Sequence, residues 1–152
     1  MSEVFNLLDG ELDAGEDRPG YRHRRRMVGW LLGGELLGAT VYEVPPEEKL
    51  WPYHWELGCE EFLVVVAGSP TVRTPGGERE LVPGDVVHFP EGEEGAHQLI
   101  NRSGEAFRVL IGSTKGSVEV AGYPDSGKLL VGGRGRQQVV VRDAPVDYWD
   151  GE

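Results

Sequence analysis

Short apolar runs, most of them ended by glycine or proline, make up most of the chain after residue 26. The strongest run covers residues 61–67 and stops at Gly68-Ser69-Pro70. Further runs follow at 71–74, 78–82, 86–89, 97–101, 107–111 and 118–121, at intervals of about 8 to 12 residues. This spacing predicts an antiparallel sandwich or barrel, and no segment shows a helix of useful length.

The ends of the chain differ from this central region. Residues 1–26 are polar, charged and interrupted by glycine, so we expect an N-terminal arm. Residues 27–121 form the predicted barrel, in which Gly33-Gly34 separates two apolar runs and predicts a hairpin. Residues 122–152 contain two more apolar runs, at 129–131 and 139–141, which predict a C-terminal hairpin and tail packed on the barrel.

Alternation along the strongest run predicts which side chains face the interior. If Glu61 faces the barrel lumen, Leu63 and Val65 face it too, while the residues between them face outward. Those outward residues are also apolar, so something must cover them. The arm, the C-terminal hairpin and a second subunit are the candidates, and we predict a homodimer packed through these outer faces.

Composition and charge limit the classes of partner. At 152 residues the chain has room for one domain, and its formal net charge is -11. Such a charge disfavours nucleic acid and anionic membrane surfaces as partners. The basic cluster at residues 22–26 is the exception. It is either a solvated or self-paired surface segment or a site for an anion or an acidic partner.

Cysteine content and the start of the chain indicate the compartment. The single cysteine excludes an intrachain disulfide framework and fits a reducing compartment. The first residues lack the basic and apolar segments of a signal peptide, and no run reaches the roughly 18 to 20 apolar residues of a membrane span. We therefore expect a cytoplasmic protein.

Candidate chemistry is concentrated in two segments. In an extended strand His54 and Glu56 lie on the same face, and Glu61 begins the next strand after a turn at Gly58. The second segment supplies His97 after a glycine-rich loop. Between them, Cys59 is interpreted as a half-exposed turn residue, with a reactive or metal-adjacent thiol as the alternative.

These segments resemble the two sequence motifs of the cupin family. His54, Glu61 and, six residues later, Gly68 match the first motif. Gly84, then Pro90-x-Gly92, and finally His97 with Asn101 match the second. The motifs cover residues 54–101, and the strand pattern extends the resemblance to about 27–121. The resemblance implies an all-β fold, a double-stranded β-helix or jelly-roll barrel.

Two positions depart from the family pattern. Glu56 stands where the family usually has a second histidine, and four residues instead of two separate Gly92 from His97. Carried over residue by residue, the metal ligands would be His54, Glu61 and His97, with Glu56 in the fourth position. Two imidazoles and two carboxylates suit one divalent transition metal, namely Mn, Fe, Ni or Zn. The alternative is a barrel that has lost its metal.

The resemblance also implies the kind of function. The predicted protein is a small-molecule metalloenzyme of the oxygenase or isomerase/epimerase type, with its small-molecule ligand in the barrel lumen. Glu56 is a possible general base if it is not bound to the ion. The alternative is a non-catalytic cupin that binds or senses a small ligand.

Overall fold

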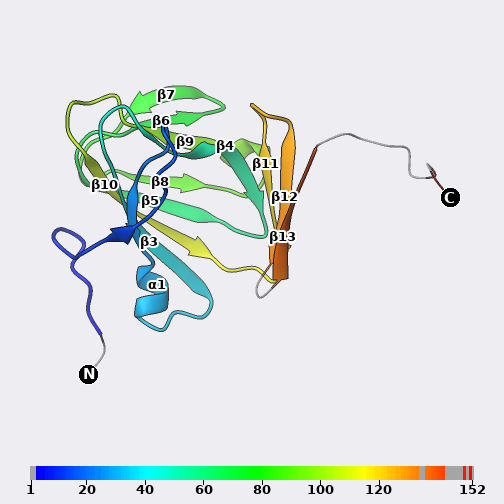
Figure 1. The fold of residues 1–152 in the computed structure, drawn as a ribbon, viewed down its shortest axis with the longest axis horizontal. Coiled ribbons are helices and arrows are strands. Elements are labelled where there is room, and N and C mark those ends of the chain that lie inside the picture. The colour runs from blue at the N-terminus through cyan, green and yellow to red at the C-terminus, as the bar shows by residue number, and fades with distance from the viewer. Residues whose placement is uncertain (1–2, 134–135, 143–148, 150, 152) are drawn as a thin grey trace.

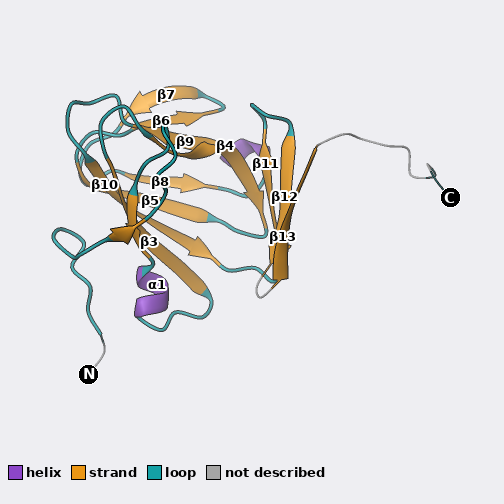
Figure 2. Cartoon of the chain, in the orientation of Figure 1, coloured by secondary structure: helices purple, strands orange, loops and turns teal. Residues whose placement is uncertain are grey.

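The computed structural model describes residues 3–133, 136–142, 149 and 151. The part of the predicted tail at 143–148, 150 and 152 lies outside the described residues. Strands dominate the described part, and helix is confined to short segments (Figure 2). No helix in this part of the chain has the length and apolar character needed to cross a bilayer. The elements are, in order, β1 Asp13–Ala14, β2 Arg24–Arg26, α1 Val28–Leu31, β3 Leu37–Val44, β4 Lys49–Leu57, β5 Glu61–Ala67, β6 Thr71–Thr74, β7 Gly77–Glu80, β8 Val86–Phe89, the 3-10 helix η1 Glu93–Gly95, β9 His97–Ile100, β10 Phe107–Thr114, β11 Glu119–Tyr123, β12 Lys128–Gly133 and β13 Arg136–Arg142.

The described strands form two antiparallel sheets that face each other (Figure 1). The six-stranded sheet has the order β1-β2-β3-β10-β5-β8, and the seven-stranded sheet has the order β13-β12-β11-β4-β9-β6-β7. Neighbours such as β10 and β3 are far apart in sequence, as a jelly roll requires. The predicted all-β jelly-roll fold is confirmed.

The core lies between the two sheets and follows the predicted alternation. On β5, Leu63 and Val65 are buried against Phe107 and Val109 of β10 and belong to one apolar cluster. Phe62, between the interior positions, is 52% exposed on the outer face of the same strand. The inward orientation of Leu63 and Val65 is therefore confirmed, whereas the homodimer across the outer face stays a prediction.

The hairpin predicted across Gly33-Gly34 is wrong. Residues Val28–Leu31 form the short helix α1, and β3 pairs instead with β2 and β10. The two glycines end the helix, because the Gly34 N–H donates to the Gly29 carbonyl and the Gly33 N–H to that of Trp30. Gly33 has φ of 76°, the left-handed conformation typical of a residue just after a helix. A pair of glycines is compatible both with a hairpin turn and with the end of a helix, so the sequence alone does not distinguish these two structures.

The C-terminal hairpin is present as β12 and β13, joined in register from Lys128↔Arg142 to Gly133↔Arg136. Its first strand pairs with β11, which in turn pairs with β4. The hairpin therefore extends the seven-stranded sheet beyond the barrel (Figure 1).

The N-terminal segment packs on the outer face of the six-stranded sheet. Leu12 and Val28 cover Val41 there, and Phe5, Leu7 and Leu110 pack against the same cluster. The basic cluster at residues 22–26 is largely paired within the chain. The Arg26 guanidinium lies 2.8 Å from Asp13, and that of Arg22 lies 3.2 Å from Glu48. These pairs favour the self-paired surface over the anion site.

Arg108 of β10 holds this arm on the barrel. It is 8% exposed, and its guanidinium donates to the carbonyl of Leu8 and, at 2.6 Å, to that of Gly10. Buried hydrogen bonds from a charged donor contribute more than neutral ones. Arg108 and a set of apolar side chains thus hold the N-terminal arm over the outer face.

Replacement of Arg108 is expected to loosen the arm. Arg108→Met should lower the free energy of unfolding by about 2–3 kcal/mol, because two hydrogen bonds from a buried charged donor are lost. The matched control is Arg102→Met, which removes an exposed pair with Glu78 and should cost less than about 1 kcal/mol. Urea denaturation measures both variants, and equal losses would contradict the clamping role of Arg108.

Candidate metal centre

Two histidines face each other because β4 contains extra residues relative to β9. The register runs from Leu50↔Leu99 to His54↔His97, so four steps along β4 match two along β9. This bulge accommodates Pro52, which lacks the N–H that a regular ladder would use. As a result the His54 and His97 rings lie with centroids 4.8 Å apart.

The bulge is held at Trp51. Its φ of 56° is in the left-handed region, where a bulky residue is rare. The Gln98 amide donates to the Trp51 carbonyl at 2.7 Å, and Gln98 itself is buried. The Trp51 ring packs edge-on against His23 and Tyr42, which fixes it from the side of the arm. Strained backbone that is held in this way is common beside functional sites.

Each of the two histidines has one ring nitrogen occupied by the backbone. The Nδ1 of His54 lies 2.8 Å from the Pro52 carbonyl, and that of His97 lies 2.9 Å from the Gly95 carbonyl. A carbonyl only accepts, so both Nδ1 atoms carry the hydrogen and both Nε2 atoms keep a free lone pair in the neutral ring. The His97 ring also stacks on Phe89 at 3.7 Å, which fixes its orientation.

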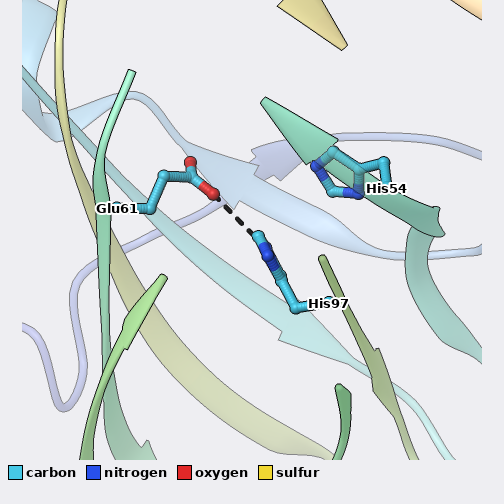
Figure 3. A group of neighbouring side chains, drawn as sticks. All are labelled: His54, Glu61 and His97. Atoms are coloured by element: carbon cyan, nitrogen blue, oxygen red, sulfur yellow. Dashed lines mark ion pairs between the residues drawn. The ribbon is translucent and has the colours of Figure 1, made fainter. Parts of the chain in front are cut away.

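Glu61 completes the group at the start of β5. Its carboxylate lies 3.3 Å from the His97 Nε2 atom, and the two side chains point toward each other, with His54 beside them (Figure 3). One ligand atom from each of the three residues lies within 4.8 Å of the others. Gly58, with φ of 82°, makes the turn between β4 and β5 that brings Glu61 to this place.

Glu56 lies close to this group but faces a second set of side chains. Its carboxylate is 4.0 Å from the His54 Nε2 atom, and it groups with Cys59 and Glu61 within 4.8 Å. Burial, together with the charge of Glu61, raises the pKa of Glu56 to about 7. The structure therefore brings His54, Glu61 and His97 into one group and Glu56 into a second group that shares Glu61, so a four-ligand site stays a prediction.

Cys59 differs from the sequence-based interpretation as a half-exposed turn residue, because it is only 7% exposed. Its thiol donates to the Thr114 carbonyl at 3.2 Å and faces the two carboxylates. Burial and the neighbouring Glu56 and Glu61 raise the pKa of the thiol, so it stays protonated. Its burial depends on β10, which the sequence around residue 59 does not reveal.

A cavity of about 190 Å³ lies beside His54 and Glu56. Three further residues of its lining, Glu119, Ala121 and Tyr123, alternate along β11, and the Tyr123 ring lies parallel to that of His54 at 5.9 Å. Sequence analysis missed Glu119 and Tyr123, since no motif marks them. The only available signal was their alternation in a short strand next to the predicted barrel.

The donor set suits a divalent transition metal. Two neutral imidazole nitrogens and a carboxylate are ordinary ligands for such ions, with bonds near 2.1 Å. Ligand atoms around one ion then lie no more than about 4.2 Å apart, so the present group needs only a small contraction. The Nδ1–H bonds to carbonyls are the usual support for a metal-bound histidine. The residues therefore fit the metal that the fold implies.

The raised pKa of Glu56 leads to a pH-dependent stability. Below its unfolded value of 4.5 the carboxyl is protonated in both states and contributes nothing. As pH rises from 4.5 to about 7, the unfolded chain releases this proton while the folded protein keeps it, so stability falls, and above 7 the folded protein carries the full cost of a buried charge. In chelator-treated protein, Glu56→Gln should therefore raise the free energy of unfolding at pH 8 by about 2 kcal/mol, after allowance for its partial exposure. The gain should vanish near pH 4.5.

Chemical denaturation at the two pH values measures this effect. Glu60→Gln is the matched control, because Glu60 is an adjacent acid whose side chain is 53% exposed. Its stability should change by less than about 0.5 kcal/mol at either pH. A Glu56→Gln variant that is no more stable than wild type at pH 8 would contradict the cost assigned to the buried Glu56 charge.

Several solved structures share this fold. A candidate sugar phosphate isomerase from Acidithiobacillus ferrooxidans is 25% identical, with a TM-score of 0.79 over 90% of this chain and 88% of that one. A sugar phosphate isomerase of the cupin superfamily from Silicibacter pomeroyi is 23% identical, with a TM-score of 0.81 over 96% and 98%. The polyketide cyclase RemF from Streptomyces resistomycificus is 24% identical, with a TM-score of 0.61 over 75% and 80%.

The sequence comparison agrees with the fold. No curated protein sequence matches the chain. The cupin domain family matches residues 40–112, a range that contains β4, β5 and β9 and with them all four candidate ligands. The fold, the two motifs and this match lead to the same assignment: the chain contains a cupin domain, matched at residues 40–112.

Proposed function

We propose that the protein is a metal-dependent enzyme of the isomerase or epimerase type that acts on a small molecule in the lumen. In this proposal His54, Glu61 and His97 hold one divalent ion of Mn, Fe, Ni or Zn. The observation that carries it is the pair of histidines whose Nδ1 atoms are bound to carbonyls, with Glu61 3.3 Å from the free nitrogen of His97. Purely structural histidines would need no shared carboxylate.

The choice of isomerase over oxygenase rests on two further points. The Acidithiobacillus protein described as a candidate sugar phosphate isomerase matches most of this chain at 25% identity. In addition, Glu56 lines the cavity beside His54, where a carboxylate can take a proton from a bound molecule. The bound ion would supply Lewis-acid polarisation of a carbonyl or hydroxyl oxygen.

The chain's own residues would divide the remaining work. Glu56 would accept the proton from the carbon that bears the hydroxyl and return it to the neighbouring carbonyl carbon, while the hydroxyl proton moves to the former carbonyl oxygen, as isomerisation of a hydroxycarbonyl compound requires. The ring of Tyr123, beside His54, would hold the molecule against the β4 side of the cavity. The earlier expectation that Glu56 is a fourth ligand stays a prediction, and the following experiment separates the two roles.

Elemental analysis of protein purified without chelators or a metal-affinity tag tests the proposal. Wild type should contain close to one equivalent of a divalent transition metal, or take it up on addition, and His97→Ala should lose it. The matched control is His88→Ala, which removes an imidazole from an outward position where it contacts Glu60. Glu56→Gln should keep the metal if Glu56 is a base, and lose affinity if it is a ligand.

Absence of metal from wild type, both as purified and after addition, would overturn the proposal. So would equal metal content in wild type and His97→Ala. If the metal is present, turnover of hydroxyaldehydes and hydroxyketones by wild type and its absence in Glu56→Gln would support the isomerase assignment. Metal binding without turnover of any such compound would favour a ligand-binding cupin instead.

A further inference from the structure

The cavity beside the candidate metal centre has an acidic lining. Glu56 and Glu119 both line it, and Glu61 lies next to Glu56 at the metal group. No lysine or arginine is among the described residues that line this cavity, which are Trp51, Pro52, His54, Glu56, Glu119, Val120, Ala121, Tyr123 and Leu130. A bound anion would therefore find no cationic side chain among the described residues of this lining.

Basic side chains near this cavity contact other groups or line other cavities. The Lys128 ammonium lies 5.5 Å from the centre of the Tyr123 ring and lines a neighbouring cavity with Arg18. The Arg73 guanidinium lies over Tyr53 and makes two hydrogen bonds to Asp125, at 2.6 and 2.9 Å. Lys115 lines a third cavity, which Glu119 also lines. None of these cations is among the described residues that line the space beside His54.

A divalent ion would not make this cavity attractive to anions. The charges of Glu61 and Glu56 together balance the two positive charges of the ion. The charge of Glu119 then remains, in a partly buried space where electrostatic interactions are weakly screened. Carboxylate oxygens accept hydrogen bonds only, so they favour hydroxyl or amine donors on the ligand. The faces of Trp51 and Tyr123 add apolar surface for a carbon skeleton.

We infer that the cavity selects a small molecule that has no negative charge and is rich in hydroxyl or amine donors, and that Glu119 is a specificity-determining residue. The inference rests on the proposed function for the location of the reaction, since it assigns the substrate class of that site. It separates this chain from the neighbours described as sugar phosphate isomerases, because a phosphate would meet Glu119 instead of a cation. The substrate class is thus a free hydroxycarbonyl compound and not its phosphate.

Dihydroxyacetone and dihydroxyacetone phosphate are suitable probes, because they share one hydroxyketone group and differ in the phosphate. Ligand-observed NMR titration measures their dissociation constants on wild-type protein, both as purified and after loading with a divalent metal. Dihydroxyacetone should bind at least about tenfold more tightly than the phosphate, since one uncompensated carboxylate repels the dianion. Raising the salt concentration from about 0.01 M to about 1 M should reduce this preference.

Glu119→Gln should strengthen binding of the phosphate several-fold relative to dihydroxyacetone, so that the ratio of the two dissociation constants moves toward one. Glu80→Gln is the matched control, because it removes the same charge from β7 at the opposite side of the sheet, and it should keep the wild-type ratio. Tighter binding of the phosphate, equal binding of the two probes, or binding of neither would overturn the inference. If salt does not change the ratio of the two dissociation constants on wild-type protein, the inference is overturned, even if Glu119→Gln fails to fold.

Metal content measured on the same samples keeps the two proposals apart. If the protein takes up no metal, the proposed function fails, while the preference between the probes still decides the charge selectivity of the cavity. If metal binds and the phosphate is preferred, the selectivity fails and the metal centre stands.

Discussion

The extra residues of β4 between Leu50 and His54 are the constraint on which the site depends. A regular ladder from Leu50↔Leu99 would carry His54 past the end of β9, and no imidazole pair would form. The bulge returns His54 to the position opposite His97, at the cost of a left-handed Trp51. Contacts that the barrel and the arm supply together hold this strained residue. Packing of the arm against Trp51 therefore also supports the position of His54 in the lumen.

Electrostatics in the lumen is the second constraint. Burial, together with the neighbouring His97, lowers the pKa of His54 and so favours its neutral form. His54 therefore adds no fixed positive charge beside the carboxylates of Glu56 and Glu61. A divalent cation would balance the two carboxylates, and protonation of Glu56 is the other way to remove the repulsion between them. The same lack of fixed positive charge explains why the adjacent cavity is unsuited to anions.

How far the sequence predicts this site depends on how local the determining contacts are. The alternation of His54 with Glu56, and of Glu61 with Leu63 and Val65, follows from strand geometry and is present in the structure. The hairpin expected across Gly33-Gly34 was wrong, because the same glycines close a helix whose position depends on packing against β3. Cys59 is buried by a contact with Thr114, a residue 55 positions away. Local pattern carries no information about such a contact.

The cavity residues were missed for the same reason, and their location has a mechanistic consequence. Ala121 pairs with Glu56, so β11 places Glu119 and Tyr123 beside His54 and Glu56 of β4 without contributing a candidate ligand itself. β4 thus has two neighbours with different tasks, since β9 brings His97 and β11 forms the wall that a bound molecule would meet. Substitutions on β11 can change what the cavity accepts while His54, Glu61 and His97 stay in place. A shared fold is therefore compatible with different substrates, and the residues of β11, not the motif residues, are the ones to compare when a substrate is assigned.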